Sequence, residues 1–590
     1  MRMNISYLQQ LYRQGQRTPR QLITDLLAQC RDADPAIWIY LLTETEIEFY
    51  LHRLDQASIE ELPLYGIPFA IKDNIDLAGI PTTAACPEFS YVPEESATVV
   101  RQLITAGAIP LGKTNLDQFA TGLVGTRSPY GVCANSFATE YIPGGSSSGS
   151  AVAVAKGLCT FALGTDTAGS GRIPAAFNNI LGLKPTRGLL STKGVVPACR
   201  SLDCVSIFAL CAGDADAVLR MAAVYDPTEP YSRRAGNCCS DSAGEESFIF
   251  AVPEEGQLEF FGNEGYAQGF ADTVALLESL GGKKQCIDLQ PFTDAAKLLY
   301  EGPWVAERTV AAGPFLQEHP EAGHPVTRQI ITQSRDFTAV ELFQAQYRLQ
   351  ELKLQTDAAL VQVDCLVLPT AGTCYTTQEV KADPVRLNSN LGIYTNFMNL
   401  LDYCGIAVPT LQTTPVPFGV TLVAPAFCEH RLLALGARLH QASGLPMGIG
   451  QESPPPYASP ESEEEVLLMV CGAHLQGLPL NHQLVDLNAR LVERTTTAPV
   501  YRMFALETQP PKPGLIRDEQ KGAAIEVEVY SMPLKALGPF TAQIPHPLGI
   551  GKVELLSGTW VSGFIAEPVV MEQGREITHF GGWRSYLVHK

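Results

Sequence analysis

Two turns rich in glycine and serine, separated by an apolar segment, constrain this chain more than any other feature. They lie in residues 143–188, PGGSSSGSAVAVAKGLCTFALGTDTAGSGRIPAAFNNILGLKPTRG, and each turn carries a serine that could do chemistry. Upstream, Lys72 ends the apolar, strand-like run of residues 66–71. Ser146 follows Lys72 by 74 positions, and Ser170 follows Ser146 by 24. A lysine and two serines can form a hydrolytic site without any histidine.

The chemistry explains why these residue types belong together. A serine hydroxyl is a weak nucleophile until a nearby base takes its proton. Lysine can be that base only while its amine is neutral, and its ordinary pKa is about 10.4. Burial disfavours the charged form, so apolar surroundings such as residues 66–71 can lower the pKa toward roughly 7–8. Taken alone, each motif has a structural alternative. Either Gly/Ser-rich turn could be an ordinary loop, and Lys72 could be an ordinary lysine that buries only its aliphatic stem.

The ordered motif resembles the amidase signature family over roughly residues 5–445. The resemblance implies that Ser170, in GTDTAGS, is the nucleophile and that Ser146, in GGSSSGS, is a bridging serine. It also implies that Lys72, in IKDNID, is the base. In the family the peptide bond before the bridging serine is cis, which predicts a cis bond between Gly145 and Ser146.

The turn before the nucleophile has a second role in acyl transfer, which needs N–H donors aimed at the developing oxyanion. By the resemblance these donors are the backbone amides of Thr167, Ala168, Gly169 and Ser170. Ala168 stands where the family often has glycine, which limits the backbone geometry without removing an N–H. Asp166 either orients this turn or caps a buried turn, and we favour the structural role. Arg172 is expected to be a structural partner.

Composition bounds the class of protein. The chain has 590 residues, which is more than one ordinary domain, and 46% of them are hydrophobic. A net charge of −20 and the lack of a basic run argue against nucleic-acid binding. Helical and strand-like segments alternate along the first three quarters of the chain. We therefore expect an α/β fold: an amidase-signature core with a mixed β-sheet covered by helices, plus a small β-rich α+β domain.

The cysteines and the N-terminus indicate the compartment. None of the 15 cysteines forms a C-x-x-C pair of the zinc type, so we expect no metal and no cofactor. Scattered cysteines in apolar segments are typical of reduced, buried thiols. The first residues, MRMNISYLQQLYRQG, have no apolar signal core, and no stretch approaches the ~20 apolar residues of a membrane span. These features predict a cytoplasmic protein that does not contact a membrane.

The clearest boundary lies at residues 448–465, GIGQESPPPYASPESEEE, where a proline-rich piece meets an acidic run. This composition is typical of a linker. It predicts a hydrolase domain over residues 1–447 and a second domain over residues 466–590. Within the second domain, VLLMVCGAHLQG, AAIEVEVYSMP and WVSGFIAEP have the apolar or alternating patterns of strands.

Several segments resemble allophanate hydrolases. The C-terminal pieces GAHLQGLPLN, YRMFAL, PPKPGLIR, AAIEVEVY, HPLGIGKVEL and FGGWRSY do so, as do GLVGTRSPYG (122–131) and LYEGPWVAERTVA (299–311). In that family a Tyr and an Arg of the last motif hold the substrate, here Tyr300 and Arg308. An arginine fork matches a carboxylate geometrically, and a tyrosine hydroxyl can bond the urea end. The alternative for Arg308 is a charge on a helix surface.

The resemblance implies hydrolysis of allophanate, the urea carboxylate anion, to ammonia and carbon dioxide through an acyl-enzyme on Ser170. The second domain is expected to assist decarboxylation of the first product. His474 in GAHLQG is our candidate there, because histidine exchanges protons near neutral pH; the alternative is a packing histidine.

Partners follow from the same comparison. The resemblance implies a homodimer. No region of ATP-grasp length and no biotinyl-lysine motif occurs in the chain, so a separate enzyme is expected to supply allophanate. Two other functions stay open: another amidase, such as the glutamine-hydrolysing subunit of a tRNA amidotransferase, and an inactive binding protein on the same fold. The C-terminal segments argue against the first, and intact Lys72, Ser146 and Ser170 argue against the second.

Overall fold

The computed structural model describes residues 3–234, 247–332, 337–411, 415–457, 465–487 and 489–589. The chain divides into two compact units, Met1–Ala458 and Ser459–Lys590. The linker predicted over residues 448–465 extends across residues 458–464, which lie outside the described residues. The predicted domain bounds, 1–447 and 466–590, stay a prediction.

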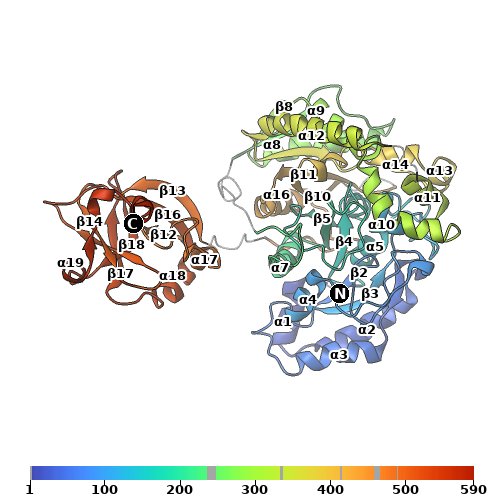
Figure 1. Ribbon diagram of the computed structural model, residues 1–590. Helices are drawn as coiled ribbons and strands as arrows, with labels where there is room; N and C mark the ends of the chain where they lie inside the picture. The colour runs from blue at the N-terminus through green and yellow to red at the C-terminus, as the bar shows by residue number, and fades with distance from the viewer. Residues whose placement is uncertain are drawn as a thin grey trace. The chain divides into compact units, whose positions relative to one another are not determined.

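The first unit is built on one mixed sheet of 11 strands (Figure 1). Across the sheet the order is β1-β3-β2-β4-β6-β5-β10-β11-β9-β7-β8. Strands β3, β2 and β4 run parallel, as do β9, β7 and β8, whereas the central pairs are antiparallel. The strands are β1 (Trp38–Leu41), β2 (Pro68–Lys72), β3 (Ile109–Thr114), β4 (Phe161–Asp166), β5 (Leu181–Lys184), β6 (Cys204–Ala209), β7 (Phe248–Pro253), β8 (Gly282–Ile287), β9 (Cys365–Pro369), β10 (Tyr403–Leu411) and β11 (Phe418–Pro425).

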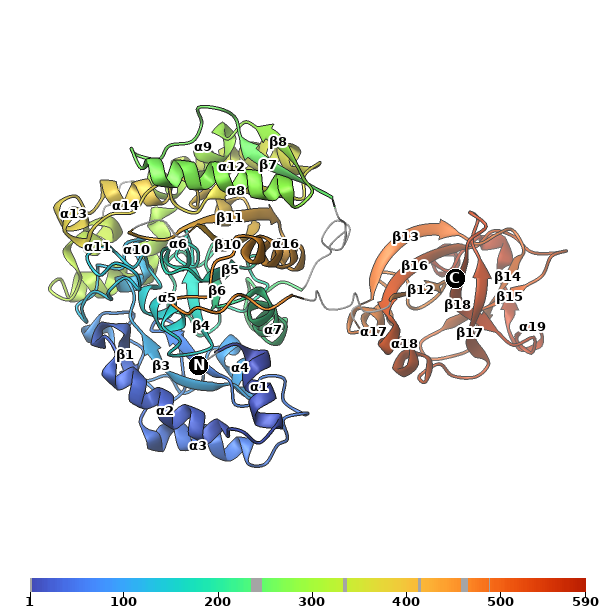
Figure 2. The same ribbon diagram turned by 180° about the vertical axis from the view of Figure 1, so that it is seen from behind.

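Helices flank this sheet (Figures 1 and 2). The short helices α5 and α6 and the longer α7 and α16 pack directly on its central strands. In order, the helices are α1 (Ile5–Arg13), α2 (Pro19–Asp32), α3 (Glu44–Leu54), α4 (Thr98–Thr105), α5 (Ser148–Ala155), α6 (Ile173–Phe177), α7 (Ala212–Ala222), α8 (Glu264–Ser279), α9 (Gln290–Tyr300), α10 (Val305–Glu318), α11 (Pro325–Thr332), α12 (Ala339–Leu360), α13 (Thr377–Ala382), α14 (Arg386–Leu391), α15 (Phe397–Leu400) and α16 (Glu429–Ala442). The predicted α/β core with a mixed sheet is confirmed.

Local sequence signals account for several of these boundaries. Pro19 is the first residue of α2. The Thr18 hydroxyl oxygen accepts a hydrogen bond from the backbone N–H of Gln21, and the Gln21 side-chain oxygen accepts one from the backbone N–H of Thr18. This is the capping box that ends the preceding loop and starts the helix. The long helical region predicted between residues 295 and 362 contains four helices, α9 to α12. It is broken near residues 320–325 as predicted, and also at Gly302-Pro303, between α9 and α10.

The second unit is rich in strands, as predicted. It holds a sheet ordered β13-β16-β12-β18-β17 and a smaller sheet ordered β15-β14-β19. The strands are β12 (Glu465–Val470), β13 (Arg490–Thr496), β14 (Tyr501–Leu506), β15 (Lys512–Arg517), β16 (Glu526–Pro533), β17 (Leu548–Glu554), β18 (Trp560–Ala566) and β19 (Arg575–Glu576). The described residues of this unit also form the helices α17 (Asn481–Val485), α18 (Leu534–Thr541), α19 (Val570–Gln573) and α20 (Trp583–Val588).

The cysteine prediction holds with one exception. The free thiols of the described residues are mostly buried, but Cys428 is disulfide-bonded, so the expectation that all cysteines are reduced is wrong there. Within the described ranges, no helix combines the length and apolar character that crossing a bilayer requires. Nor do three or more His, Cys, Asp or Glu side chains gather as a metal site in that part of the chain.

Candidate active site

The strand order brings the predicted catalytic residues to one edge of the sheet. β2 and β4 are parallel neighbours, with Ile71 opposite Leu163. Their carboxyl ends therefore meet at the same edge, and Lys72 faces the turn that follows β4. Helix α5 begins two residues after Ser146 and packs on both strands. The fold thus assembles residues that are 74 and 98 positions apart in the sequence.

Lys72 is fully buried and bonded to two hydroxyl groups. Its Nζ lies 2.8 Å from Ser146 Oγ and 2.8 Å from Thr165 Oγ1. Burial lowers the pKa of Lys72 to about 7, against the attraction of three nearby carboxylates. These carboxylates belong to Asp117, Asp166 and Asp203. A large fraction of the amine is therefore neutral near pH 7, as a base for serine requires.

Ser146 and Ser170 stand on separate turns. The peptide bond between Gly145 and Ser146 is cis, as the family resemblance predicts. Ser170 is 3% exposed, and its Oγ lies 3.5 Å from the carbonyl oxygen of Gly122. Among the described residues no hydrogen bond joins Ser146 to Ser170. The structure therefore contains the lysine–serine contact of the predicted relay but not the serine–serine contact.

A buried ion pair fixes the turn around Ser170. The carboxylate of Asp166 accepts hydrogen bonds from the amides of Gly169, at 2.8 Å, and Gly171, at 3.0 Å. It also pairs with both ends of the Arg172 guanidinium, at 2.8 and 2.9 Å. Both side chains are fully buried. Asp166 thus orients the turn by making its structural bonds, so the two roles considered for it coincide, and Arg172 is its structural partner as predicted.

One of the predicted oxyanion donors is already hydrogen-bonded. The N–H of Gly169 donates to Asp166 at 2.8 Å, and its role as a substrate-binding group stays a prediction. The amides of Thr167, Ala168 and Ser170 have no hydrogen-bond partner within the described ranges. Gly169 has φ +129°, and a Cβ there would lie 2.4 Å from Thr395 Oγ1. The positive φ and the close approach of Thr395 therefore both require glycine at position 169.

Two residues that hold this site were missed by the sequence analysis. Asp203 accepts hydrogen bonds from the Thr167 hydroxyl and from the amides of Ala198 and Cys199, and burial raises its pKa to about 6. Thr165, on β4, accepts a hydrogen bond from Lys72, the predicted base. Neither residue lies in a motif that marks its role. Asp203 reaches Thr167 only because β4 and β6 are paired in the sheet.

Arg308 and Tyr300 lie together, as the family motif implies. Arg308, on α10, is 2% exposed, which excludes the alternative of a helix-surface charge. Its Nη1 donates to Thr121 Oγ1 at 2.8 Å, and its Nη2 donates to the Tyr300 hydroxyl at 3.1 Å. Its positive charge also lowers the pKa of Lys72, a smaller effect than burial. In the described part of the chain no carboxylate forms an ion pair with Arg308. A buried guanidinium with neutral partners is suited to an anion.

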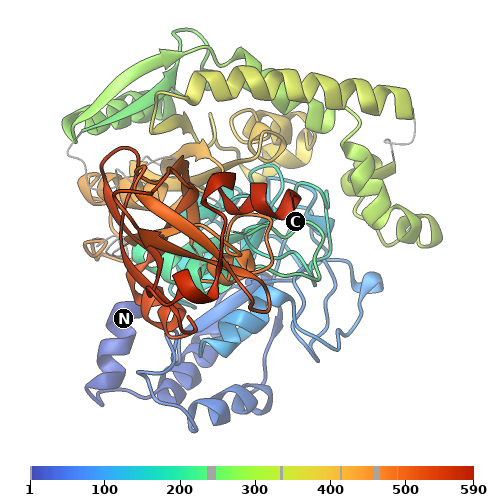
Figure 3. The same cartoon turned by 60° about the vertical axis from the view of Figure 1, so that its left-hand side comes forward.

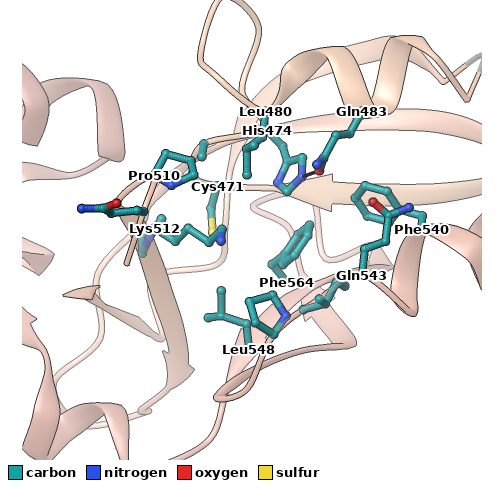
Figure 4. Close-up of a pocket in the computed structure, with 16 residues that line it drawn as sticks. Cys471, His474, Leu480, Gln483, Pro510, Lys512, Phe540, Gln543, Leu548 and Phe564 are labelled. Carbon is teal, nitrogen blue, oxygen red and sulfur yellow. Dashed lines mark hydrogen bonds between the residues drawn. The ribbon is translucent and has the colours of Figure 1, made fainter. Parts of the chain in front are cut away.

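His474 lines a cavity of about 240 Å³ in the second unit (Figure 4). Its Nε2 lies 3.0 Å from Gln483 Oε1, and its ring stacks on Phe564 with centroids 5.1 Å apart. Burial lowers the pKa of His474; the hydrogen bond to Gln483 opposes this shift, and the charge of Lys512 adds to it. His474 is thus packed on aromatic rings and also lines a cavity with Lys512; its role in the reaction stays a prediction.

Comparison with known families matches both units. The sequence model of the family described as "Amidase" matches residues 21–433. The model described as "Allophanate hydrolase C-terminal domain" matches residues 466–588. The first match covers Lys72, Ser146 and Ser170, as well as Tyr300 and Arg308, and the second covers His474.

Individual proteins give the same result. The urea amidolyase of Saccharomyces cerevisiae is 42% identical over 93% of this chain, which spans only 31% of that protein, about a third of its length. The urea amidolyase of Lachancea kluyveri is also 42% identical, over 97% of this chain and 32% of its own. A solved structure of Kluyveromyces lactis allophanate hydrolase superposes with a TM-score of 0.73 at 40% identity, covering 98% of each chain.

Proposed function

The chain belongs to the amidase family, and from this premise we propose that it hydrolyses allophanate to ammonia and carbon dioxide. One observation carries the proposal: a fully buried lysine, its pKa lowered to about 7, is bonded to a serine and lies near a buried arginine that has no carboxylate partner in the described residues. The first group supplies a base for acyl transfer, and the second supplies recognition of an anion. The likeness to an allophanate hydrolase over 98% of both chains supports this substrate.

The acylation step uses the Ser–Ser–Lys residues. Lys72 takes a proton from Ser146, which takes the proton of Ser170 as its oxygen attacks the carbamoyl carbon. The amides of Thr167, Ala168 and Ser170 bind the oxyanion that develops. The proton returns through Ser146 to the leaving nitrogen, so that the C–N bond breaks and ammonia departs. Ser170 then carries the remaining carboxycarbamoyl group as an ester.

Water completes the first reaction, and the second unit acts on the product. The same base activates a water molecule that cleaves the ester, which frees Ser170 and releases N-carboxycarbamate. Loss of carbon dioxide from this dianion, with uptake of one proton at nitrogen, leaves carbamate, which takes up a second proton and decays to carbon dioxide and ammonia. We propose that the second unit assists this decarboxylation. His474, which lines the cavity of that unit, would transfer the proton that the step requires. The presence of Lys512 beside His474 supports this, because a cation can hold a carboxylate.

We propose that residues of α9 and α10 bind allophanate. The Arg308 fork would bind the carboxylate and the Tyr300 hydroxyl the urea group, which leaves the terminal carbamoyl carbon for Ser170. Arginine is stronger than lysine in this role because its planar donors match both carboxylate oxygens.

The assembly and its setting belong to the same proposal. We propose a homodimer in the cytoplasm. Most free thiols of the described residues are buried, which favours a reducing compartment. The disulfide at Cys428 is the exception to this pattern.

The substrate assignment is tested by ammonia release from a panel. Allophanate, biuret, malonamate, glutamine and propionamide are incubated with the purified protein, and kcat/KM is measured for each. We expect allophanate to exceed every other substrate by at least ~100-fold, since only it offers both a carboxylate and a terminal carbamoyl group in the right spacing. Preference for glutamine would instead favour an amidotransferase component, and no turnover of any amide would favour an inactive binding protein.

A further inference from the structure

The loop of residues 117–127 contacts both a catalytic turn and the predicted recognition arginine. The carbonyl oxygen of Leu123 accepts a hydrogen bond of 2.8 Å from the amide of Gly145, the residue before the bridging serine. The Thr121 hydroxyl oxygen accepts a hydrogen bond of 2.8 Å from Arg308. Arg308 reaches this loop from α10, which lies with α11 at one side of the first unit (Figures 1 and 3). The position of its guanidinium therefore depends on the loop that it meets.

The 117–127 loop has a backbone that local preference does not favour. Phe119 and Ala120 both have φ +52°, in the left-handed region that residues other than glycine rarely adopt. Such a backbone persists only where the surrounding contacts hold it in place. Thr121 directly follows these two residues in the chain. The contacts of the loop therefore decide where the Thr121 hydroxyl lies.

Arg127 supplies several of these contacts from the end of the loop. Its side chain is 2% exposed. Nη1 donates to the carbonyl oxygen of Thr121 at 2.9 Å, and Nη2 donates to the carbonyl oxygen of Pro384, near the start of α14, at 2.7 Å. The backbone N–H of Arg127 donates to the Asp117 carboxylate at 2.9 Å. Arg127 thus ties Thr121 both to the start of the loop and to a segment more than 250 positions away in the sequence.

Two buried positive charges meet at Thr121. Arg127 donates to its carbonyl oxygen, and Arg308 donates to its hydroxyl oxygen. Within the described ranges neither guanidinium has a carboxylate ion pair, and Nε of Arg127 is buried without a hydrogen-bond partner. Burial lowers the pKa of Arg127; the charge of Asp117 opposes this shift, and the charge of Arg308 adds to it. Two buried like charges that repel each other favour the binding of an anion over that of a neutral molecule.

We infer that Arg127 is a positioning residue that makes the site selective for an anionic substrate. It holds the backbone of Thr121, Thr121 holds Arg308, and the second positive charge strengthens the preference for a carboxylate. Arg127 is assigned no contact with the reacting atoms. The inference rests on the hydrolysis of allophanate proposed above.

A purely structural role for Arg127 has a different consequence. The same loop contacts the amide of Gly145 through Leu123. A variant in which the loop loses its shape would therefore disturb the catalytic turn as well, and it would impair every substrate alike. A loss confined to anionic substrates is the mark of a role in recognition.

Comparison of allophanate with biuret tests this selectivity, because biuret has a neutral carboxamide where allophanate has its carboxylate. The measured quantities are kcat and KM for both substrates. Where biuret turnover is too slow to follow, its inhibition constant against allophanate is compared with KM for allophanate. Arg127→Met should lower the preference for allophanate over biuret by at least ~10-fold, mainly by raising KM for allophanate. Arg127→Lys keeps the charge and a donor, so it should recover part of this preference.

Two further variants locate the effect. Arg438→Met is the matched control: Arg438, on α16, also donates to a backbone carbonyl, that of Leu280 at 2.7 Å, and its loss should leave the preference unchanged. Thr121→Val removes only the hydroxyl that accepts from Arg308, and it should lower the preference as Arg127→Met does. Because both changes act on Arg308 through Thr121, the double variant should lose less than the product of the two single losses.

The possible outcomes separate this inference from the proposed function. A wild-type protein that releases no ammonia from allophanate overturns the proposed function and this inference with it. If wild type hydrolyses allophanate, the inference alone is wrong when Arg127→Met leaves the preference unchanged or impairs both substrates equally. Circular dichroism checks that each variant folds. If Arg127→Met does not fold, Arg127→Lys and Thr121→Val decide, and an unchanged preference in both overturns the inference.

Discussion

Replacing the buried base should stabilise the protein while removing its activity. Lys72 is fully buried, and burial lowers its pKa from an ordinary value of about 10.4 to about 7. At pH 7.5 this difference in pKa between the unfolded and folded states lowers the free energy of unfolding by roughly 4 kcal/mol. Lys72→Met removes this cost, loses two hydrogen bonds of 2.8 Å worth about 1 kcal/mol each, and keeps a similar volume. The net expectation is a gain of roughly 2 kcal/mol in the free energy of unfolding.

The sign of the pH dependence makes this prediction specific. Between pH 7 and pH 10 an unfolded lysine at this position binds a proton that the folded lysine has lost. Wild type therefore gains stability as pH rises through this range, whereas Lys72→Met lacks this gain. By pH 10 the cost of burying Lys72 falls to roughly 1 kcal/mol, so the advantage of the variant should vanish or reverse.

Urea unfolding at pH 7.5, 8.5 and 9.5 measures the difference between the two proteins. Lys113→Met is the matched control, because Lys113 is equally buried but pairs with Asp73 at 2.8 Å. Its loss leaves a buried carboxylate unpaired and should destabilise the fold by about 3–5 kcal/mol. A Lys72→Met protein less stable than wild type at pH 7.5, or a gap that does not narrow as pH rises, would refute the reasoning about a neutral lysine.

Three further predictions concern the reaction. Lys72→Arg should lose at least ~100-fold in kcat, because arginine stays charged, and wild-type kcat/KM should rise with pH up to a pKa near 7; a pH–rate profile checks both. Arg308→Lys should raise KM for allophanate more than it lowers kcat and leave hydrolysis of propionamide nearly unchanged, as the ratio of their kcat/KM values would show. Asp203→Asn removes a negative charge that raises the pKa of Lys72, so the rising limb of the pH–rate profile should move to lower pH; an unmoved limb would exclude this coupling.

The sequence predicts the parts of the structure that are local. The capping box of α2 is encoded by Thr18 and Gln21, and the alternating pattern of AAIEVEVYSMP becomes the strand β16. Long, ordered motifs predict Lys72, Ser146 and Ser170 as site residues, and the structure brings Lys72 against Ser146. The cis bond before Ser146 came from the resemblance and is present.

The remaining features depend on contacts between distant segments. Asp203 reaches the catalytic turn through the pairing of β4 with β6, and no local pattern marks that contact. Arg308 could be a surface or a buried residue on its helix, and only the packing of α10 decides that it is buried. The family resemblance implies a donor role for Gly169, and it does not predict that the N–H of Gly169 donates to Asp166. Sequence spacing locates residues along the chain; it does not state which partner each backbone group meets.

The central claim is that Ser170 is the nucleophile of an allophanate hydrolase. The most direct measurement is the initial rate of ammonia release from allophanate by wild type and by Ser170→Ala. The two proteins are purified separately by the same procedure, and circular dichroism checks that their folded structure is the same. The account predicts turnover by wild type and a loss of at least ~10⁴-fold in the variant, which keeps its fold because only one hydroxyl is removed. Near-normal ammonia release by a folded Ser170→Ala protein would contradict it.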